Sequence, residues 1–451
     1  MKRWIKVNLA GGTLAFILFG VAAAGTFEDG QVEYGRGNYA AAILLWRPLA
    51  EEGNAHAQNT LGFIYANGQG VPQDYEQAVS WYRKAADEGS IDAQSALGFM
   101  YAKGQGVAQD YGQAVTWCRK AADQGNVDAQ NNLGVLYADG QGVPLDYTQA
   151  FIWFRRAADQ GNAQAQVKLG LMYAYGLGVP QDYEQAVMWY GKAADQGDTF
   201  AQGKLGVMYA NGQGVPRDYE QAVMWYRKAA DQEDAFAQGK LGVMYANGKG
   251  VPQDNALALM WYRKAADHGD AFAQGKLGVM YANGQGVMQD NALALMWYRK
   301  AADQGSADAQ NKLGEVYEEG RGVPQDYVLA VAWYLKAADQ GNADAQGKLG
   351  MMYDEGRGVP QDYALANLWY RKAADQGDDV AEYNLGAMYG SGRGVPQDYT
   401  QAYLWLNLAA SRASDAATRD KAVKSRDRVA AKMAPAQIAE AQRMAREWVP
   451  K

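Results

Sequence analysis

Apolar residues recur at helical spacing along most of the chain, in segments of about 13 residues that end in glycine-rich turns. In the segment AHAQNTLGFIYAN, Ala57, Leu61 and Tyr65 fall on one face of a helix, and Gly68 suits the left-handed position just past the helix end. The connection G-Q-G-V-P follows. Its glycines accept positive φ, and Pro72 cannot sit inside a helix. The pattern therefore predicts a helix and then a tight turn.

A second helix is predicted between Asp74 and Gly89. The Asp74 carboxylate can accept from the free N–H groups of the first turn, and Gln77, three residues later, would complete a capping box. Trp81 and Tyr82 share the apolar face of this helix with alanines. Because helices of this length are marginal alone in water, each pair must stack on its neighbours to bury its apolar stripes.

This helix pair repeats every 36 residues. The stretch AFAQGKLGVMYANG occurs at 235–248 and again, letter for letter, at 271–284. One tyrosine column contains Tyr65, Tyr101, Tyr137, Tyr173, Tyr209, Tyr245, Tyr281, Tyr317, Tyr353 and Tyr389. One tryptophan column contains Trp81, Trp117, Trp153, Trp189, Trp225, Trp261, Trp297, Trp333, Trp369 and Trp405. Ten units in register predict an all-α fold, a right-handed α-solenoid of about ten 36-residue helix-turn-helix repeats with a concave face.

The repeats are predicted to occupy residues 55–410, with different segments at the two ends. Residues 25–54 resemble half a repeat and are expected to form an N-terminal cap, in which Trp46 takes the slot of Tyr82. Residues 411–451 are expected to form two C-terminal capping helices, the second of them amphipathic. Such caps cover the apolar faces that terminal repeats would otherwise expose.

The repeated pattern A-x-A-x-x-x-L-G-x-x-Y-x-x-G-x-G-V-x-x-D-x-x-x-A-x-x-W-Y-x-K-A-A-x-x-G resembles the Sel1-like repeat, a relative of the tetratricopeptide repeat with a longer loop between its helices. The resemblance covers roughly four fifths of the chain. It implies an adaptor that holds other proteins, and exported bacterial proteins of this kind often serve envelope or host-facing assemblies. One departure is Glu233, which replaces the glycine that stops the second helix, so we expect a less well defined turn there.

The first 24 residues resemble a secretory signal peptide. Lys2, Arg3 and Lys6 precede an apolar run at 9–21, and three alanines at 22–24 offer a cleavage site. We therefore expect a periplasmic or secreted protein with no stable membrane span after cleavage. An uncleaved anchor is the alternative, although the apolar run is shorter than the roughly 20 residues that a spanning helix needs.

Charge and composition narrow the possible chemistry. Residues 25–410 carry 30 Lys/Arg against 45 Asp/Glu, a net charge of −15, which argues against nonspecific binding to nucleic acid. The single cysteine, Cys118, excludes an intramolecular disulfide and falls in the Tyr82 column, so we expect it to be a core residue. His56 and His268 are more than 200 residues apart and lack metal-ligand spacing. No metal site, cofactor or catalytic residue is expected, and the chain is not expected to be an enzyme.

Two columns on the first helix of each repeat are not explained by packing, because they are offset from the apolar stripe. One column holds six consecutive lysines: Lys168, Lys204, Lys240, Lys276, Lys312 and Lys348. The other column, one turn earlier, holds Phe200, Phe236 and Phe272. Asparagines stand further along the same three helices, at Asn211, Asn247 and Asn283. Exposed apolar patches tend to mark contacts, so these twelve residues form the partner-binding hypothesis.

Two other interpretations of these columns stay open. The phenylalanine repeats could record a recent duplication, and Asp308–Lys312 and Asp344–Lys348 have the spacing of ordinary i,i+4 ion pairs. The first functional hypothesis is a non-catalytic exported scaffold whose concave face binds a protein or an extended peptide segment. The alternative is a binder of acidic envelope or extracellular polysaccharide.

Overall fold

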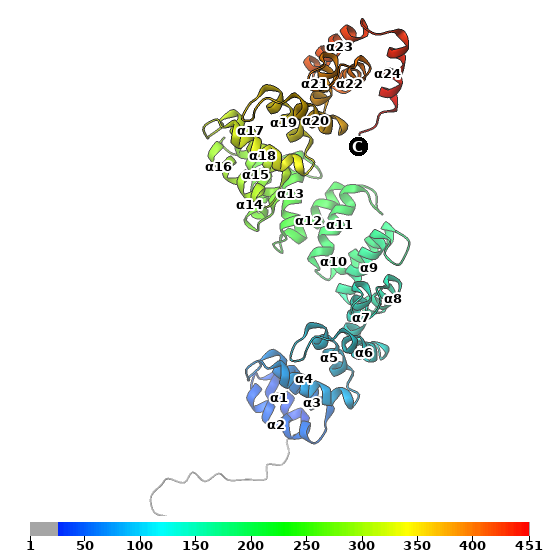
Figure 1. The fold of residues 1–451 in the computed structure, drawn as a ribbon. Coiled ribbons are helices and arrows are strands. Elements are labelled where there is room, and N and C mark those ends of the chain that lie inside the picture. The colour runs from blue at the N-terminus through cyan, green and yellow to red at the C-terminus, as the bar shows by residue number, and fades with distance from the viewer. Residues whose placement is uncertain (1–25, 451) are drawn as a thin grey trace, which may run out of the picture. The chain divides into compact units, whose positions relative to one another are not determined.

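The computed structural model describes residues 26–450, all of whose regular secondary structure is helical (Figure 1). The expected signal peptide at residues 1–24 lies outside this part. Within the described residues, no helix combines the length and the apolar character that crossing a membrane requires. The chain divides after Asp198 into two compact units, the second of which begins at Thr199.

The first unit contains ten helices and the second contains fourteen, which confirms the all-α fold. The helices of the first unit are α1 (Phe27–Gly35), α2 (Tyr39–Glu51), α3 (Ala55–Asn67), α4 (Tyr75–Asp87), α5 (Ile91–Lys103), α6 (Tyr111–Asp123), α7 (Val127–Asp139), α8 (Tyr147–Asp159), α9 (Ala163–Tyr175) and α10 (Tyr183–Asp195). The helices of the second unit are α11 (Thr199–Asn211), α12 (Tyr219–Ala230), α13 (Ala235–Asn247), α14 (Asn255–Asp267), α15 (Ala271–Asn283), α16 (Asn291–Asp303), α17 (Ala307–Glu319), α18 (Tyr327–Asp339), α19 (Ala343–Glu355), α20 (Tyr363–Asp375), α21 (Asp379–Ser391), α22 (Tyr399–Arg412), α23 (Ala416–Ala430) and α24 (Pro435–Glu447).

Each repeat consists of a first helix, here called helix A, and a second, helix B. Helix A of the first repeat is capped by Asn54, whose side chain accepts from the Ala57 N–H at 2.9 Å. It ends at Gly68, which has a φ of 67° and therefore the predicted left-handed conformation. Helix B begins after Asp74, whose Oδ1 accepts from the Gln77 N–H at 2.9 Å. Local signals in the sequence thus fix both ends of the helices.

The expected capping box at Asp74 is not formed. Its second bond would take the Asp74 backbone N–H to the side chain of Gln77, but that N–H donates instead to the carbonyl of Tyr65 at 2.9 Å. The equivalent aspartate and tyrosine are bonded in the same way in all ten repeats. The long loop is therefore tied back to the last turn of helix A by its own backbone.

Within a repeat, the two helices approach closely at a glycine. A Cβ built on Gly62 would lie 2.7 Å from the ring of Tyr82, so only glycine allows this contact. Cys118 takes the aromatic position in the second repeat, against Gly98, and is 1% exposed. Burial raises the pKa of the Cys118 thiol to about 12. The prediction of a core cysteine is confirmed.

The two aromatic columns differ in burial. Eight of the ten column tryptophans are at most 9% exposed, and a cation covers the ring, as Lys228 Nζ does at 4.0 Å from the Trp225 centroid. The tyrosines are buried only at Tyr245, Tyr281 and Tyr317 and are half-buried elsewhere, so placing that whole column in the interior was wrong. The phenol needs a polar partner, and the hydroxyl of Tyr245 accepts from Arg227 of the preceding repeat at 2.6 Å.

A column of buried glutamines, here called the glutamine ladder, connects successive repeats within each unit. Gln94 is 6% exposed, and its Nε2 donates to the carbonyl of Ala86 at the end of the preceding helix B. Its Oε1 accepts from the side chain of Gln124 at 2.9 Å. Equivalent buried glutamines are Gln58, Gln130, Gln166, Gln202, Gln238, Gln274, Gln310 and Gln346. This polar ladder lies inside an otherwise apolar stack.

The helices at both ends of the described residues pack on the neighbouring repeat. Trp46 of α2 lies against Gly30 of α1, as the residue that occupies the Tyr82 slot should, and it packs in one cluster with Ala57 and Leu61 of α3. At the other end, the ring of Trp448, just after α24, lies 5.9 Å from that of Trp405 in α22. The terminal helices thereby cover apolar surface of the outermost repeats.

Glu233 keeps the turn between its repeat and the next, with the same backbone hydrogen bonds as the equivalent Gly269, so the expectation of a less well defined turn is not met. It has a φ of 64° and is the only non-glycine residue with positive φ in the described part of the chain. Helix α12 ends at Ala230 and has 12 residues, whereas the equivalent helix in the preceding repeat, α10, has 13. The left-handed conformation persists even though the glycine that favours it has been replaced.

Candidate functional site

The three repeated phenylalanines lie on the surface of the second unit. Phe200, Phe236 and Phe272 are 47%, 45% and 47% exposed, although each stands in the first turn of a well-packed helix A. Leu205 and Leu241, on the opposite stripe of α11 and α13, are at most 2% exposed. The rings are therefore not part of the core that holds the repeats together.

Each phenylalanine is paired with the lysine one turn later. The Nζ atoms of Lys204 and Lys276 lie 4.9 and 5.1 Å from the ring centroids of Phe200 and Phe272. Lys240 lies between two rings, 5.0 Å from Phe236 and 5.9 Å from Phe272 in the next repeat. These six residues are called the Phe–Lys ladder: Phe200, Lys204, Phe236, Lys240, Phe272 and Lys276.

The lysines of this ladder have no acidic partner. Within the described residues, Lys204, Lys240 and Lys276 form no ion pair, and their ammonium groups lie over the adjacent rings. A cation over a ring at an exposed site is worth about 0.5–1 kcal/mol, much less than a bidentate pair with a desolvated carboxylate. Their charges therefore remain available to a partner.

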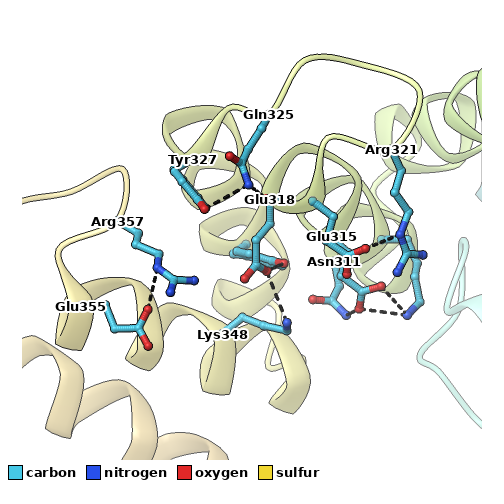
Figure 2. A network of polar contacts seen from close by, with 12 residues as sticks. Asn311, Glu315, Glu318, Arg321, Gln325, Tyr327, Lys348, Glu355 and Arg357 are labelled. Atoms are coloured by element: carbon cyan, nitrogen blue, oxygen red, sulfur yellow. Dashed lines mark hydrogen bonds and ion pairs between the residues drawn. The ribbon is translucent and has the colours of Figure 1, made fainter.

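The last two lysines of the column behave differently. Lys312 Nζ lies 2.9 Å from Glu315, and Lys348 Nζ lies 3.3 Å from Glu318 of the preceding helix A (Figure 2). Both charges are thus compensated inside the protein. The continuous column of six lysines that the sequence shows is reduced, in the second unit, to three lysines without acidic partners.

The expected i,i+4 pairs of these two lysines are not formed. Asp308 Oδ1 instead accepts from Asn342 Nδ2 at 3.1 Å, a contact to the next repeat. A short aspartate in the first turn is held by that amide, whereas the longer glutamates reach the ammonium groups. The alternative explanation of Lys312 and Lys348 as ion-paired residues holds, but with other partners.

The remaining predicted site residues are distributed differently. Lys168 is exposed on α9 and belongs to the first unit, whereas the Phe–Lys ladder belongs to the second. Asn247 donates back to the carbonyl of Val243 at 2.9 Å, and Asn211 donates to Gln213 Oε1 at 3.3 Å. Asn283 is exposed. The asparagines thus lie at the far end of helix A, and two of them are bonded within their own repeat.

A cavity of about 300 Å³ adjoins the last ring of the Phe–Lys ladder. It is lined by Phe272, Lys276, Tyr298 and Asn311, among others. Asn311 is 2% exposed and donates to Glu315, while its Oδ1 has no partner. Sequence inspection missed this cavity because it depends on how two repeats pack, although the asparagine stands out where neighbouring repeats have glycine.

Comparison with known proteins identifies the repeat. The family model described as "Sel1 repeat" matches ten consecutive segments, 55–90, 91–126, 127–162, 163–198, 199–234, 235–270, 271–306, 307–342, 343–378 and 379–414. The chain belongs to the Sel1 repeat family. These ten Sel1 repeats place the chain in the tetratricopeptide-like superfamily and confirm the solenoid of 36-residue units that the sequence predicts.

Two solved Sel1 repeat structures are similar. One is c5321, a protective antigen present in uropathogenic Escherichia coli strains, which is 36% identical, covers 90% of this chain and 94% of its own, and has a TM-score of 0.65. The other is a Sel1 repeat protein from Oxalobacter formigenes, 41% identical over 68% of this chain and 90% of its own, with a TM-score of 0.57. No curated protein sequence matches the chain.

Sel1 repeat proteins are generally non-catalytic scaffolds that bind other proteins. In the described part of this Sel1 chain, no group of three His, Cys, Asp or Glu side chains is arranged to hold a metal ion. His56 and His268 are both exposed. The Phe–Lys ladder lies on helix A of three consecutive Sel1 repeats.

Proposed function

We propose that this chain is an exported, non-catalytic scaffold that binds an extended protein segment on the helix A face of its Sel1 repeats. The main contact in the second unit is the Phe–Lys ladder, and the segment that it binds carries alternating apolar and acidic side chains. The observation that carries the proposal is the combination of three half-exposed rings with three lysines that have no acidic partner.

The rings supply the apolar part of the interaction. A phenylalanine that is 45% exposed, as Phe236 is, retains on the order of 90 Å² of apolar surface, and covering it contributes about 2 kcal/mol before the costs of association. Folding has left this surface uncovered in three consecutive repeats. Apolar surface repeated in this way favours a contact with another protein.

The spacing of the rings suits an extended chain. Because Lys240 lies within 5.0 and 5.9 Å of the Phe236 and Phe272 centroids, the two rings are at most about 11 Å apart. An extended segment advances about 3.3 Å per residue, so side chains two residues apart, which lie on the same face of the segment, can meet successive rings. Acidic residues between them would reach the lysines.

The direct test replaces Phe200, Phe236 and Phe272 together by serine. Short blocked peptides that alternate leucine and glutamate are titrated by fluorescence anisotropy, and thermal melting is measured in parallel. We expect at least a tenfold loss of affinity, the consequence of losing a contact of about 1.4 kcal/mol or more. The melting temperature should change little because the rings are half-exposed.

The matched control replaces three other exposed apolar residues in the same repeats. Met224, Met260 and Met296 are 38–40% exposed on helix B, so serine there removes similar apolar area from a different face. Binding should be unaltered in this variant. The Phe–Lys ladder would be rejected as the contact if the phenylalanine variant bound the peptides as tightly as the original protein. It would also be rejected if both variants lost the same affinity.

A binder of acidic polysaccharide is the second candidate, because rings beside uncompensated lysines can also hold a uronic acid chain. Salt distinguishes the two: an interaction carried by lysines weakens steeply between low and high ionic strength, whereas one carried by phenylalanines does not. Export is tested separately by mass spectrometry of the protein purified from its native host. Cleavage after Ala24 is expected, and a full-length chain in the membrane fraction would contradict it.

A further inference from the structure

The first unit has a cavity of its own on the helix A face, larger than the one beside the Phe–Lys ladder. Its volume is about 660 Å³, and it is lined mainly by residues of α3, α5 and α7, together with Tyr34, Tyr82, Asn126 and Gln164. Its fourteen lining residues include two carboxylates, from Asp92 and Asp128, and no lysine or arginine. The charge of this cavity is therefore opposite to that of the Phe–Lys ladder.

The two carboxylates retain hydrogen-bonding capacity. Asp92 Oδ1 accepts from Asn126 Nδ2 at 3.2 Å, and Asp128 Oδ1 accepts from Asn162 Nδ2 at 3.5 Å. In the described part of the first unit, neither carboxylate is in an ion pair. A carboxylate offers about four acceptor positions, so a single amide leaves most of them available.

A buried acceptor of the same cavity lacks a partner. Asn131 is 7% exposed, lines the cavity, and has a side-chain oxygen without a hydrogen bond. Leaving a buried polar atom without a hydrogen bond is unfavourable, and native proteins rarely do so.

Two aromatic rings complete the lining. Phe63 and Phe99 are 45% and 43% exposed and occupy the same position in consecutive repeats. Exposed phenylalanine faces attract cations, and the planar guanidinium group stacks on them better than an ammonium group does. The carboxylates and the ring faces both favour the same chemical group.

We propose that this cavity binds an arginine side chain carried by an extended protein segment. Guanidinium is planar, donates five N–H bonds, accepts none and is weakly hydrated, which matches a lining of acceptors and rings. Residues 25–198 contain 11 Lys/Arg and 20 Asp/Glu, so the net charge of −9 also attracts a basic segment. The site is separate from the Phe–Lys ladder and does not depend on it.

The same helix A positions carry different chemistry in the two units. The position of Asp92 and Asp128 is occupied by phenylalanine at 236, and the position of Asn132 is occupied by Lys240. Aspartate returns at this position in Asp308 and Asp344 of the second unit. These last two residues supply a matched control, because their cavity also contains two lysines, Lys276 and Lys312.

The experiment uses three short blocked glycine–serine peptides, which carry arginine, lysine or citrulline at alternate positions. Each is titrated with the protein, and binding is measured by fluorescence anisotropy. We expect the arginine peptide to bind tightest and the uncharged citrulline peptide weakest. The double variant D92N/D128N should weaken the arginine peptide about tenfold or more, whereas D308N/D344N should not. Both pairs of aspartates are exposed, so both variants should fold.

A second variant adds a charge without removing a carboxylate. Asn132→Lys introduces at the cavity the ammonium group that the equivalent position carries in the second unit, and it should abolish arginine-peptide binding. Equal affinity for the arginine and citrulline peptides, or unaltered binding in D92N/D128N, would overturn the proposal. The acidic peptides that test the Phe–Lys ladder should bind this variant as they bind the unmodified protein, so the two proposals can fail independently.

Discussion

Arg412 donates from Nη1 to Oε1 of Glu382 at 3.1 Å, in the place where other repeats join two glutamines. Glu382 occupies the ladder position of the last repeat and is 0% exposed. Its Oε2 has no partner, because a carboxylate lacks the N–H that the ladder glutamines donate to the preceding helix. The glutamine ladder therefore ends in a buried carboxyl group paired with an exposed arginine.

Stability near this pair should depend on pH. Burial raises the pKa of Glu382 to about 7, opposed by Arg412 and reinforced by Asp379 and Asp378. Because the pKa of Glu382 is higher in the folded than in the unfolded state, protonation of this carboxyl stabilises the fold. The stabilisation is fully present below about pH 4.5 and is lost as pH rises through 7. The total loss of folding free energy is at most about 3 kcal/mol. Hydrogen exchange of residues 379–412 should therefore become faster, relative to its intrinsic rate, from pH 5 to pH 8.

Glu382→Gln should remove this pH dependence, since glutamine restores the N–H donor and keeps an oxygen for Arg412. The exposed Glu76→Gln serves as control and should leave the profile unchanged. A Glu382→Gln protein with the same pH profile as the original would show that the carboxylate does not titrate in this range.

His268→Gln should stabilise the second unit. The Oε1 of Gln238 has no partner, and the residue 30 positions later, which supplies the partner in other repeats, is His268. Glutamine there can donate as Gln304 does to Gln274 at 2.8 Å, and one recovered buried bond is worth about 1 kcal/mol. Urea denaturation followed by circular dichroism measures the gain, and the reverse change Gln304→His should produce a loss.

Glu233→Gly should also stabilise the protein, by about 1 kcal/mol, because glycine adopts positive φ without the steric cost that a side chain incurs. Gly269, with a φ of 88° at the equivalent position of the next repeat, provides the converse test. Gly269→Glu should lower the denaturation midpoint. If both variants melt like the original protein, the left-handed turn carries no strain.

Two glycines of α13 and α15 should respond in opposite directions to alanine. A Cβ on Gly242 would lie 2.5 Å from the Tyr262 ring, so Gly242→Ala forces the helices apart and should cost about 1–3 kcal/mol. A Cβ on Gly275 meets nothing within 4 Å, so Gly275→Ala should stabilise by up to about 1 kcal/mol through helix propensity. Paired denaturation curves test both, and a neutral Gly242→Ala would contradict the close packing.

Much of the fold could be predicted from the sequence because its determinants are local. The left-handed glycine at Gly68, the aspartate cap at Asp74 and the 36-residue columns all act within one repeat. The capping box at Gln77 was predicted wrongly because the competing acceptor, the Tyr65 carbonyl, becomes available only when the loop folds back. The local sequence pattern does not show which of the two acceptors, the Gln77 side chain or the Tyr65 carbonyl, the Asp74 N–H will choose.

The candidate site was predicted less completely, since it depends on contacts between repeats. The exposure of Phe236 followed from its offset from the apolar stripe, but the pairing of Lys348 with Glu318 joins two different repeats. In nine of the ten repeats a ladder glutamine follows an alanine at the same position of helix A, and Glu382 stands there in the last repeat. A polar residue that recurs in a core register is the signal that could have revealed the ladder.

The register of the glutamine ladder also bears on how such a chain evolves. Every rung joins residues 30 positions apart across a 36-residue period, so adding or deleting one complete repeat inside a unit recreates the same bonds at the new junction. A recombination event that removes only part of a repeat would leave buried glutamine side chains without hydrogen-bond partners on both sides of the junction. Selection for solubility alone would therefore favour changes in length by whole multiples of 36 residues. Surfaces such as the Phe–Lys ladder can then be duplicated without any change in the buried contacts between repeats.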